Sequence, residues 1–231
     1  MTHDVDAVIA RLAALRDRID AVDRTWTHAV EIVAVTKAFD PSIIDVAVRS
    51  GCAAIGENYA QDLLSKRDAI EQIAPESRPR IDFIGHLQSN KVRQLAGLVD
   101  RWCTVDRISL AREIARRDPG AEVLVQVNAT GEADKSGCVP SDVAELARAC
   151  TDSGLRVGGL LTIGPTNEPV EAARSGFREV RELVDAMGLA VCSMGMTGDL
   201  EVGVACGASS VRVGSALFGP RPVHQQPHGR G

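Results

Sequence analysis

The chain has 231 residues, of which 45% are hydrophobic, and carries a formal net charge of −5 at pH 7. This length suits one large domain or two small ones, and the charges are interspersed, which argues against a nucleic-acid-binding protein with a basic stripe. No apolar run approaches the roughly 20 residues that span a bilayer, and the polar residues 1–4 are unlike a signal peptide. We therefore expect a cytoplasmic protein without a membrane partner.

Six cysteines are scattered along the chain with no Cys-x-x-Cys pair. In a chain of this size and composition they predict reduced, mostly buried thiols of the cytosol rather than disulfides. The same spacing argues against a zinc centre, so no metal site is expected.

Residues 4–22 repeat apolar side chains every three or four positions with charged residues between them, which predicts an amphipathic helix with one buried stripe. Beyond this segment, short apolar runs alternate with helical stretches. The predicted strands are residues 32–36, 53–55, 81–84, 101–104, 122–127, 157–162, 189–193 and 210–213. The predicted helices between them are residues 42–49, 58–73, 90–99, 108–117, 141–151, 170–187 and 200–206.

Alternating strands and helices predict parallel strands joined by crossover helices, and eight such strands in about 180 residues close a barrel. We therefore predict an α/β fold, a single (β/α)8 TIM-type barrel over residues 1–220 with an extra N-terminal helix. Gly219 and Pro220 follow the last strand almost at once, so the N-terminal helix is expected to fill the missing place in the outer ring. Residues 221–231 are rich in Pro, Gln, His and Gly, which predicts a disordered tail.

The first predicted strand runs directly into Lys37. On this stretch alone, Lys37 is either the first solvated residue after the strand or a desolvated amine able to form a Schiff base. The turns after the last two strands are the second notable feature, since these turns are the usual phosphate site of such barrels. They contain Ser193, Thr197, Gly214 and Ser215, and their hydroxyl and backbone N–H groups suit an anion.

A phosphate site and a lysine at one barrel mouth suggest two chemistries. One is a Schiff-base aldolase acting on a sugar phosphate, and the other is pyridoxal 5′-phosphate (PLP) bonded to the lysine. Aldolase-type barrels more often carry the lysine late in the chain, so a first-strand lysine favours PLP. Arg212 at the end of the last strand fits a PLP ring nitrogen that stays unprotonated, because a guanidinium cannot accept a proton.

These segments together resemble the YggS/PROSC-type pyridoxal phosphate homeostasis proteins, whose barrel is similar to the N-terminal domain of alanine racemase. The resemblance covers nearly all of residues 33–219. Its motifs, in chain order, are Ala-Val-Thr-Lys37, Ile-Gly-Glu-Asn-Tyr59, Phe-Ile-Gly-His-Leu-Gln-Ser-Asn-Lys91, Gln-Val-Asn128 with Lys-Ser-Gly137, Gly-Leu-Leu-Thr162, Ser-Met-Gly-Met196 and Val-Arg-Val-Gly-Ser-Ala-Leu-Phe-Gly219.

The resemblance implies a set of cofactor-binding residues. PLP would be attached to Lys37, with Arg212 near the pyridine nitrogen and Asn58 close to the ring. The phosphate would lie on Ser193, Thr197, Gly214 and Ser215. The family usually has Ser at the position of Thr197 and Thr at that of Ser215, and both exchanges keep a hydroxyl.

The expected function is to hold PLP as a Lys37 Schiff base in intracellular PLP (vitamin B6) homeostasis, with apo PLP enzymes as possible recipients. The alternative is a PLP-dependent amino-acid racemase of low activity, which would need a second acid or base that alanine racemase takes from a further domain and a partner subunit. No such domain is expected here, and the barrel is expected to be a monomer. Tyr59 is expected to pack, Lys91 and Lys135 to be solvated, and His86 either to shuttle protons or to be held by hydrogen bonds.

Overall fold

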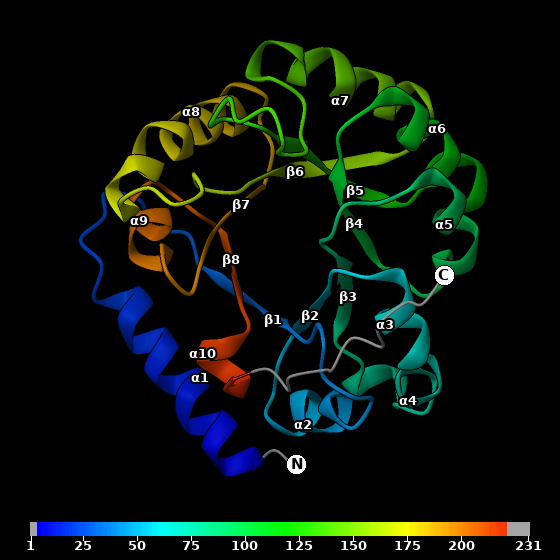
Figure 1. Cartoon of the computed structure of the whole chain (residues 1–231), viewed down its shortest axis with the longest axis vertical. Coiled ribbons are helices and arrows are strands. Elements are labelled where there is room, and N and C mark those ends of the chain that lie inside the picture. Colours follow the sequence, from blue (N-terminus) through cyan, green and yellow to red (C-terminus); the bar gives the residue numbers. More distant parts are fainter. Residues whose placement is uncertain (1–3, 221–231) are drawn as a thin grey trace, which may run out of the picture.

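The computed structural model describes residues 4–220 and contains a closed barrel of eight parallel strands that follow one another in chain order (Figure 1). The last strand pairs with the first and closes the barrel. The predicted barrel is confirmed, whereas the predicted disorder of residues 221–231 lies outside the described residues. The strands are β1 (Glu31–Val35), β2 (Ala54–Glu57), β3 (Arg80–Phe83), β4 (Arg101–Val105), β5 (Glu122–Val127), β6 (Arg156–Thr162), β7 (Val191–Met196) and β8 (Ser210–Val213).

The helices form the outer ring around this barrel. They are α1 (Val5–Asp20), α2 (Ile43–Arg49), α3 (Ala60–Ser65), α4 (Arg67–Glu71), α5 (Ser89–Leu95), α6 (Ile108–Arg117), α7 (Val143–Asp152), α8 (Ala173–Ala186), α9 (Leu200–Ala205) and α10 (Ser215–Phe218). Short 3-10 turns are η1 (Pro75–Ser77), η2 (Pro140–Asp142) and η3 (Val170–Ala172). The single helix predicted over residues 58–73 is wrong in one respect, because the chain breaks at Lys66 into α3 and α4.

The N-terminal helix occupies the place where the outer ring would be thinnest. α10, which follows β8, has only four residues, and α1 packs against α10, α9 and α2 (Figure 1). Its buried stripe consists of Val8, Leu12, Leu15 and Ile19. Arg11 also donates from Nη1 to the carbonyl of Leu217 at 3.2 Å. The predicted role of the N-terminal helix is therefore confirmed.

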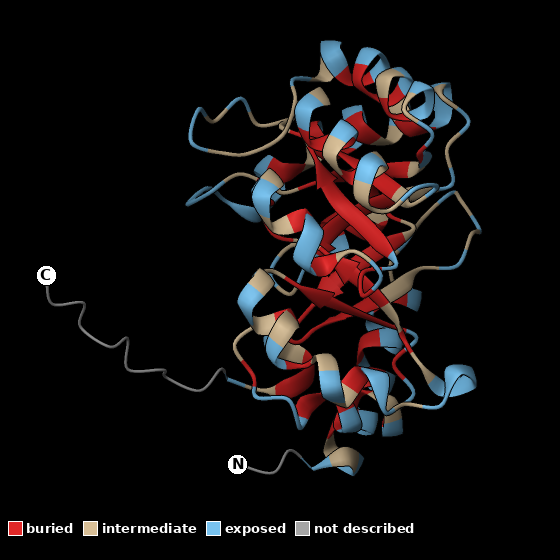
Figure 2. Cartoon of the chain, turned by 90° about the vertical axis from the view of Figure 1, so that its right-hand side faces the viewer, coloured by how far each residue is buried: buried red, intermediate tan, exposed pale blue. Residues whose placement is uncertain are grey.

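The core has two parts, and Figure 2 shows the buried strands running through the centre with the exposed residues on the outer faces of the helices. The larger cluster fills the space between the strands and the helices. A smaller cluster of Cys103, Leu124 and Leu161 forms separately from it. Side chains alternate between the two faces of each strand, so the register of a strand decides which side chains reach the barrel mouth.

Charged side chains gather at the N-terminal ends of the strands. Arg80 binds Glu31 at 2.6 Å and Asp82 at 2.7 Å, and Arg101 binds Glu122 at 2.5 Å. This set (Glu31, Arg80, Asp82, Arg101 and Glu122) is hereafter the lower charged layer. It belongs to the opposite end of the barrel from Lys37, which follows the C-terminal end of β1.

The cysteines are all free thiols, and five of the six are buried. Within residues 4–220 no helix is long and apolar enough to cross a membrane. The same residues contain no cluster of three or more His, Cys, Asp or Glu side chains arranged to hold a metal ion.

Candidate functional site

Lys37 and Gly214 follow neighbouring strands at one rim of the barrel. In the β1–β8 pairing Val33 lies beside Arg212, and Ala34 lies beside Val213. A Cβ atom built on Gly214 would lie 3.3 Å from the carbonyl oxygen of Val35, two residues before Lys37. The half-buried Lys37 and the turn that ends β8 are therefore adjacent at the C-terminal rim, as the predicted strand order requires.

Arg212 lies inside the barrel wall just before this turn, and it is almost fully buried. It donates from Nη1 to Ser193 Oγ at 2.7 Å and from Nη2 to the carbonyl of Thr162 at 2.8 Å. Burial lowers the pKa of Arg212 to about 10, which still leaves the guanidinium protonated at neutral pH. The rim thus has a buried cation that can donate hydrogen bonds but cannot accept a proton.

The turns after β7 and β8 bring two hydroxyl groups to the same side of the barrel. Thr197 is half-buried in the turn after β7, and Ser215 is exposed at the start of α10. β7 and β8 are paired, with a register shift between Ser193 and Met196. Gly195 lies in this shifted segment with φ 90°, a conformation that favours glycine.

A cavity of about 260 Å³ opens on the β2–β5 side of the rim, lined among others by Asn58, His86, Gln126 and Lys135. The side-chain oxygens Asn58 Oδ1 and Gln126 Oε1 are buried and accept no hydrogen bond from the described residues. Such atoms are normally satisfied by water or a ligand, so this cavity suits a polar ligand. Gly85 lets the neighbouring turn approach Asn58, because a Cβ at Gly85 would lie 1.8 Å from the carbonyl oxygen of Asn58.

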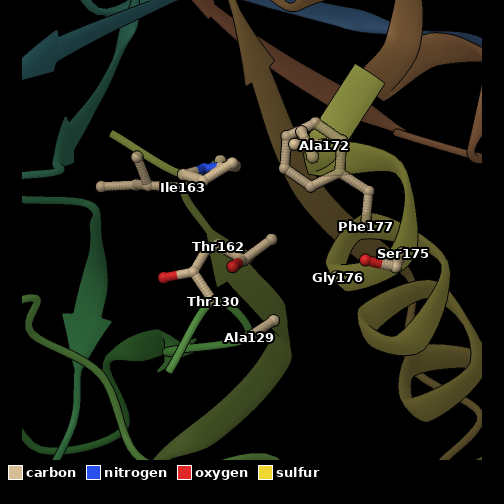
Figure 3. Close-up of a pocket in the computed structure, with 11 residues that line it drawn as sticks. Ala129, Thr130, Thr162, Ile163, Ala172, Ser175, Gly176 and Phe177 are labelled. Carbon is tan, nitrogen blue, oxygen red and sulfur yellow. The ribbon is translucent and has the colours of Figure 1, made fainter. Parts of the chain in front are cut away.

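A second cavity of about 150 Å³ lies between the ends of β5 and β6 and the start of α8. Figure 3 shows Thr130 and Thr162 on one side of it, and Ser175 and Phe177 on the other. Its lining residues, all within residues 129–177, include no charged side chain. None of its lining residues comes from the turns after β7 and β8, so this cavity is not the predicted phosphate site.

Below the rim, Glu57 and Lys66 form a buried ion pair that the sequence reasoning missed. Both side chains are fully buried, and Thr36 also donates to Glu57 Oε1 at 2.6 Å. Burial raises the pKa of Glu57 and outweighs the opposing effect of Lys66. The signal was present in the sequence: Lys66 falls on the apolar stripe that contains Leu63 and Ile70, where a lysine requires a buried partner.

The remaining candidates differ from expectation in two cases. Tyr59 does not pack, since it precedes α3 with 59% of its surface exposed. Lys135 is not solvated: it pairs with Glu132 at 2.7 Å and donates to the carbonyl of Gly164 at 2.5 Å. His86 is held by a hydrogen bond, with Nδ1 2.9 Å from Ser136 Oγ.

Sequence comparison places this barrel among known proteins. The family model of the alanine racemase N-terminal domain matches residues 10–222. The pyridoxal phosphate homeostasis protein of Pseudomonas aeruginosa is 36% identical over 221 residues, which cover 92% of this chain and 94% of that protein. The protein of the same name from Aquifex aeolicus is 35% identical over 225 residues, covering 91% of this chain and 97% of the relative.

Solved structures agree with the sequence comparison. PipY of Synechococcus elongatus with PLP bound is 27% identical, with a TM-score of 0.76 over 91% of this chain and 99% of that one. The D-threo-3-hydroxyaspartate dehydratase of Delftia, 21% identical with a TM-score of 0.66 over 94% of this chain and 60% of that one, shares the fold. With its barrel, its first-strand lysine and these relatives, the chain belongs to the alanine racemase N-terminal-domain family and, within it, to the pyridoxal phosphate homeostasis proteins.

Proposed function

We propose that this chain binds PLP at the C-terminal rim of its barrel and holds it as a Schiff base on Lys37. The observation that carries this proposal is the β1–β8 pairing, which sets the lysine-bearing turn beside the Gly214 turn, while Arg212 lies beside Val33 deeper in the same two strands. An amine and an anion-binding turn on neighbouring strands can reach the two ends of one small aldehyde phosphate. Relatives named for PLP homeostasis and the PLP-bound PipY structure support the same choice of cofactor.

The donor set fits the chemical groups of PLP. We assign the phosphate to Ser193, Thr197, Gly214 and Ser215, whose hydroxyl and backbone N–H groups are donors. Asn58 lies at the rim with an unsatisfied buried oxygen, and we place it beside the ring. Bound there, PLP would supply an aldehyde that a lysine amine converts reversibly to a Schiff base.

Arg212 favours cofactor handling over amino-acid racemisation. It is protonated, buried and already donating to Ser193 and Thr162, so it cannot give the ring nitrogen a full proton. A ring nitrogen that stays neutral is a weak electron sink, which disfavours chemistry through a carbanion. Tyr59, the single tyrosine of the sequence, is largely exposed.

The cellular role that follows is storage and delivery of PLP in intracellular vitamin B6 homeostasis. We infer that the protein works as a monomer in the cytoplasm, and that apo PLP enzymes receive its cofactor. The names of the relatives support the homeostatic role. Delivery also fits a covalent bond that water hydrolyses, which returns the free aldehyde and the lysine amine.

One experiment tests the proposal directly. Protein incubated with PLP is desalted, reduced with borohydride, digested and analysed by mass spectrometry. We expect the reduced pyridoxyl group on the peptide containing Lys37, and an unmodified Lys37 in protein that retains PLP would overturn the Schiff base. Chiral analysis after incubation with single L-amino acids distinguishes the alternative: a turnover of about one per second, the low end of ordinary enzymes, would establish a racemase instead. Light scattering coupled to gel filtration checks the monomer.

A further inference from the structure

The backbone on both sides of Lys37 is held by side chains from the α3 segment. On the N-terminal side, Lys66 donates from Nζ to the carbonyl oxygen of Thr36 at 2.7 Å. On the C-terminal side, the N–H of Ala38 donates to Asp62 Oδ2 at 2.9 Å. Asp62 and Lys66 are four residues apart, one helical turn, so a single segment holds both peptide groups that flank the lysine.

Ala38 has a backbone conformation that needs such support. Its φ is 64°, in the left-handed region that alanine rarely adopts. A residue persists there only where the surrounding contacts determine it, and such residues gather at functional sites. The Asp62 carboxylate supplies that contact at the N–H of Ala38. The turn that carries Lys37 is therefore fixed in a conformation that this stretch of sequence would not adopt by itself.

Glu57 completes the arrangement from β2. Its Oε1 accepts from Thr36 Oγ1 at 2.6 Å and pairs with Lys66, and the side chains of both members of the pair have no exposed surface. A buried ion pair is weak evidence for stability, since apolar residues of similar size often serve as well. This pair instead makes two hydrogen bonds to one residue, Thr36: Glu57 accepts from its hydroxyl and Lys66 donates to its carbonyl. Its specific contribution is the placement of the residue before Lys37.

We infer that Glu57, Asp62 and Lys66 are positioning residues that clamp the backbone of Lys37, so that its amine is presented at one place on the rim. They act through Thr36 and Ala38 rather than by touching the cofactor. The inference rests on the proposed function, because it concerns how readily Lys37 captures the PLP aldehyde. Small displacements of a reacting group cost rate steeply, so the clamp determines the rate of capture more than the stability of the barrel.

The test compares Asp62→Ala with the conservative Asp62→Asn, and uses Asp68→Ala as a matched control on an exposed aspartate of the next helix. The readouts are the rate of borohydride-trapped labelling of Lys37 by PLP, the melting temperature, and hydrogen exchange at the Ala38 amide. Losing a hydrogen bond to a charged acceptor should slow labelling about tenfold in Asp62→Ala. Asp62→Asn keeps an acceptor oxygen and should stay within about threefold of the native rate. Asp68→Ala should match the native protein.

A second variant tests the buried pair, because removing either partner alone would leave an unpaired buried charge and strongly destabilise the protein. Glu57→Gln combined with Lys66→Met keeps the shape without the charges. We expect this double variant to stay folded, with a melting temperature lowered because the buried Thr36 carbonyl loses its donor, and to label Lys37 about tenfold more slowly.

The outcomes separate the two proposals. If native protein is not labelled at Lys37, the proposed function fails and the clamp fails with it. If native protein is labelled, and Asp62→Ala and the double variant are labelled at the same rate, the clamp alone is overturned. A lower melting temperature in Asp62→Ala with an unchanged labelling rate and unchanged exchange at Ala38 would likewise reduce these residues to a structural role.

Discussion

Arg212 donates a hydrogen bond of 2.7 Å to Ser193 Oγ, and this bond ties β8 to β7 inside the barrel just below the rim. The same guanidinium reaches the carbonyl of Thr162 at the end of β6 at 2.8 Å. One buried cation therefore links three consecutive strands at the level where the turns proposed to bind the phosphate begin. Replacing Arg212 should therefore affect both the stability of the barrel and the proposed surroundings of the cofactor.

We expect Arg212→Met to lower the free energy of unfolding by about 1–3 kcal/mol, because the buried carbonyl of Thr162 loses its charged donor. The absorbance spectrum of bound PLP should change as well if Arg212 lies beside the ring nitrogen, as we propose. Urea unfolding and absorbance spectroscopy measure the two effects, with the exposed Arg93→Met as the control. A variant with the native spectrum would remove Arg212 from the ring nitrogen.

Lys37→Ala should abolish the borohydride-stable adduct and the long-wavelength absorbance of the bound cofactor. The barrel should remain folded, with a change in unfolding free energy below about 1 kcal/mol, because a half-buried rim side chain contributes little packing. Mass spectrometry and thermal unfolding are the measurements, and the half-buried Lys91→Ala provides a matched lysine control. An unfolded Lys37→Ala protein would show that the residue is structural.

Arg80→Met should destabilise the protein by about 3 kcal/mol at pH 7, because it leaves the buried Asp82 without its partner in the lower charged layer. Burial raises the pKa of Asp82. For Glu31, burial alone would raise the pKa, but the bonds and charge of Arg80 outweigh it and lower the pKa.

The sign of the pH dependence follows from these two directions. The lowered pKa of Glu31 means that its pairing stabilises the fold above the unfolded pKa and is lost as the pH falls through the folded value. Asp82, once protonated, no longer needs Arg80. The difference between native protein and Arg80→Met should therefore shrink from pH 7 to about pH 3, measured by urea unfolding. Arg116→Met, at an exposed pair with Glu113, should show little effect, and a constant difference across this range would contradict the assignment.

Gly85→Ala should destabilise the barrel by about 2 kcal/mol or more, because the new Cβ would meet the carbonyl oxygen of Asn58 at 1.8 Å. It should also weaken PLP binding by displacing Asn58, as measured by equilibrium dialysis. Gly97→Ala is a control for the effect of backbone strain without a steric clash. Gly97 has φ 80° but no atom lies within 4 Å of its Cβ position. That control should cost about 1 kcal/mol and leave PLP binding unchanged. Equal effects of the two variants on binding would contradict the collision.

The barrel could be predicted from sequence because most of its strands are short apolar runs bounded by helix stop signals. β5 and β8 begin and end where the pattern placed them. β7 was placed too early, at residues 189–193 instead of Val191–Met196. The segment around Gly195 does not have the side-chain pattern of a strand, and it becomes one through its irregular pairing with β8.

The residues at the C-terminal rim could be predicted because the C-terminal ends of parallel barrel strands all lie at one face. Locating that face requires only the order of the strands. The Glu57–Lys66 pair could not be derived in the same way, because the partner of a buried lysine is chosen by packing between β2 and α3. The left-handed backbone conformation of Ala38 could not be predicted either, since an alanine gives no sequence signal for it. Local periodicity therefore predicts the position of Lys37, whereas non-local contacts from β2 and α3 determine the conformation of the backbone around it.

The pairing of β1 with β8 has a consequence for protein synthesis. A ribosome releases the lysine-bearing turn well before the Gly214 turn, so a nascent chain possesses the amine before it possesses the turns proposed to bind the phosphate. Until β8 docks against β1, the Gly214 turn is not beside the amine. If PLP is held as proposed, its capture therefore requires the closed barrel, and a chain that ends before β8 would not retain it.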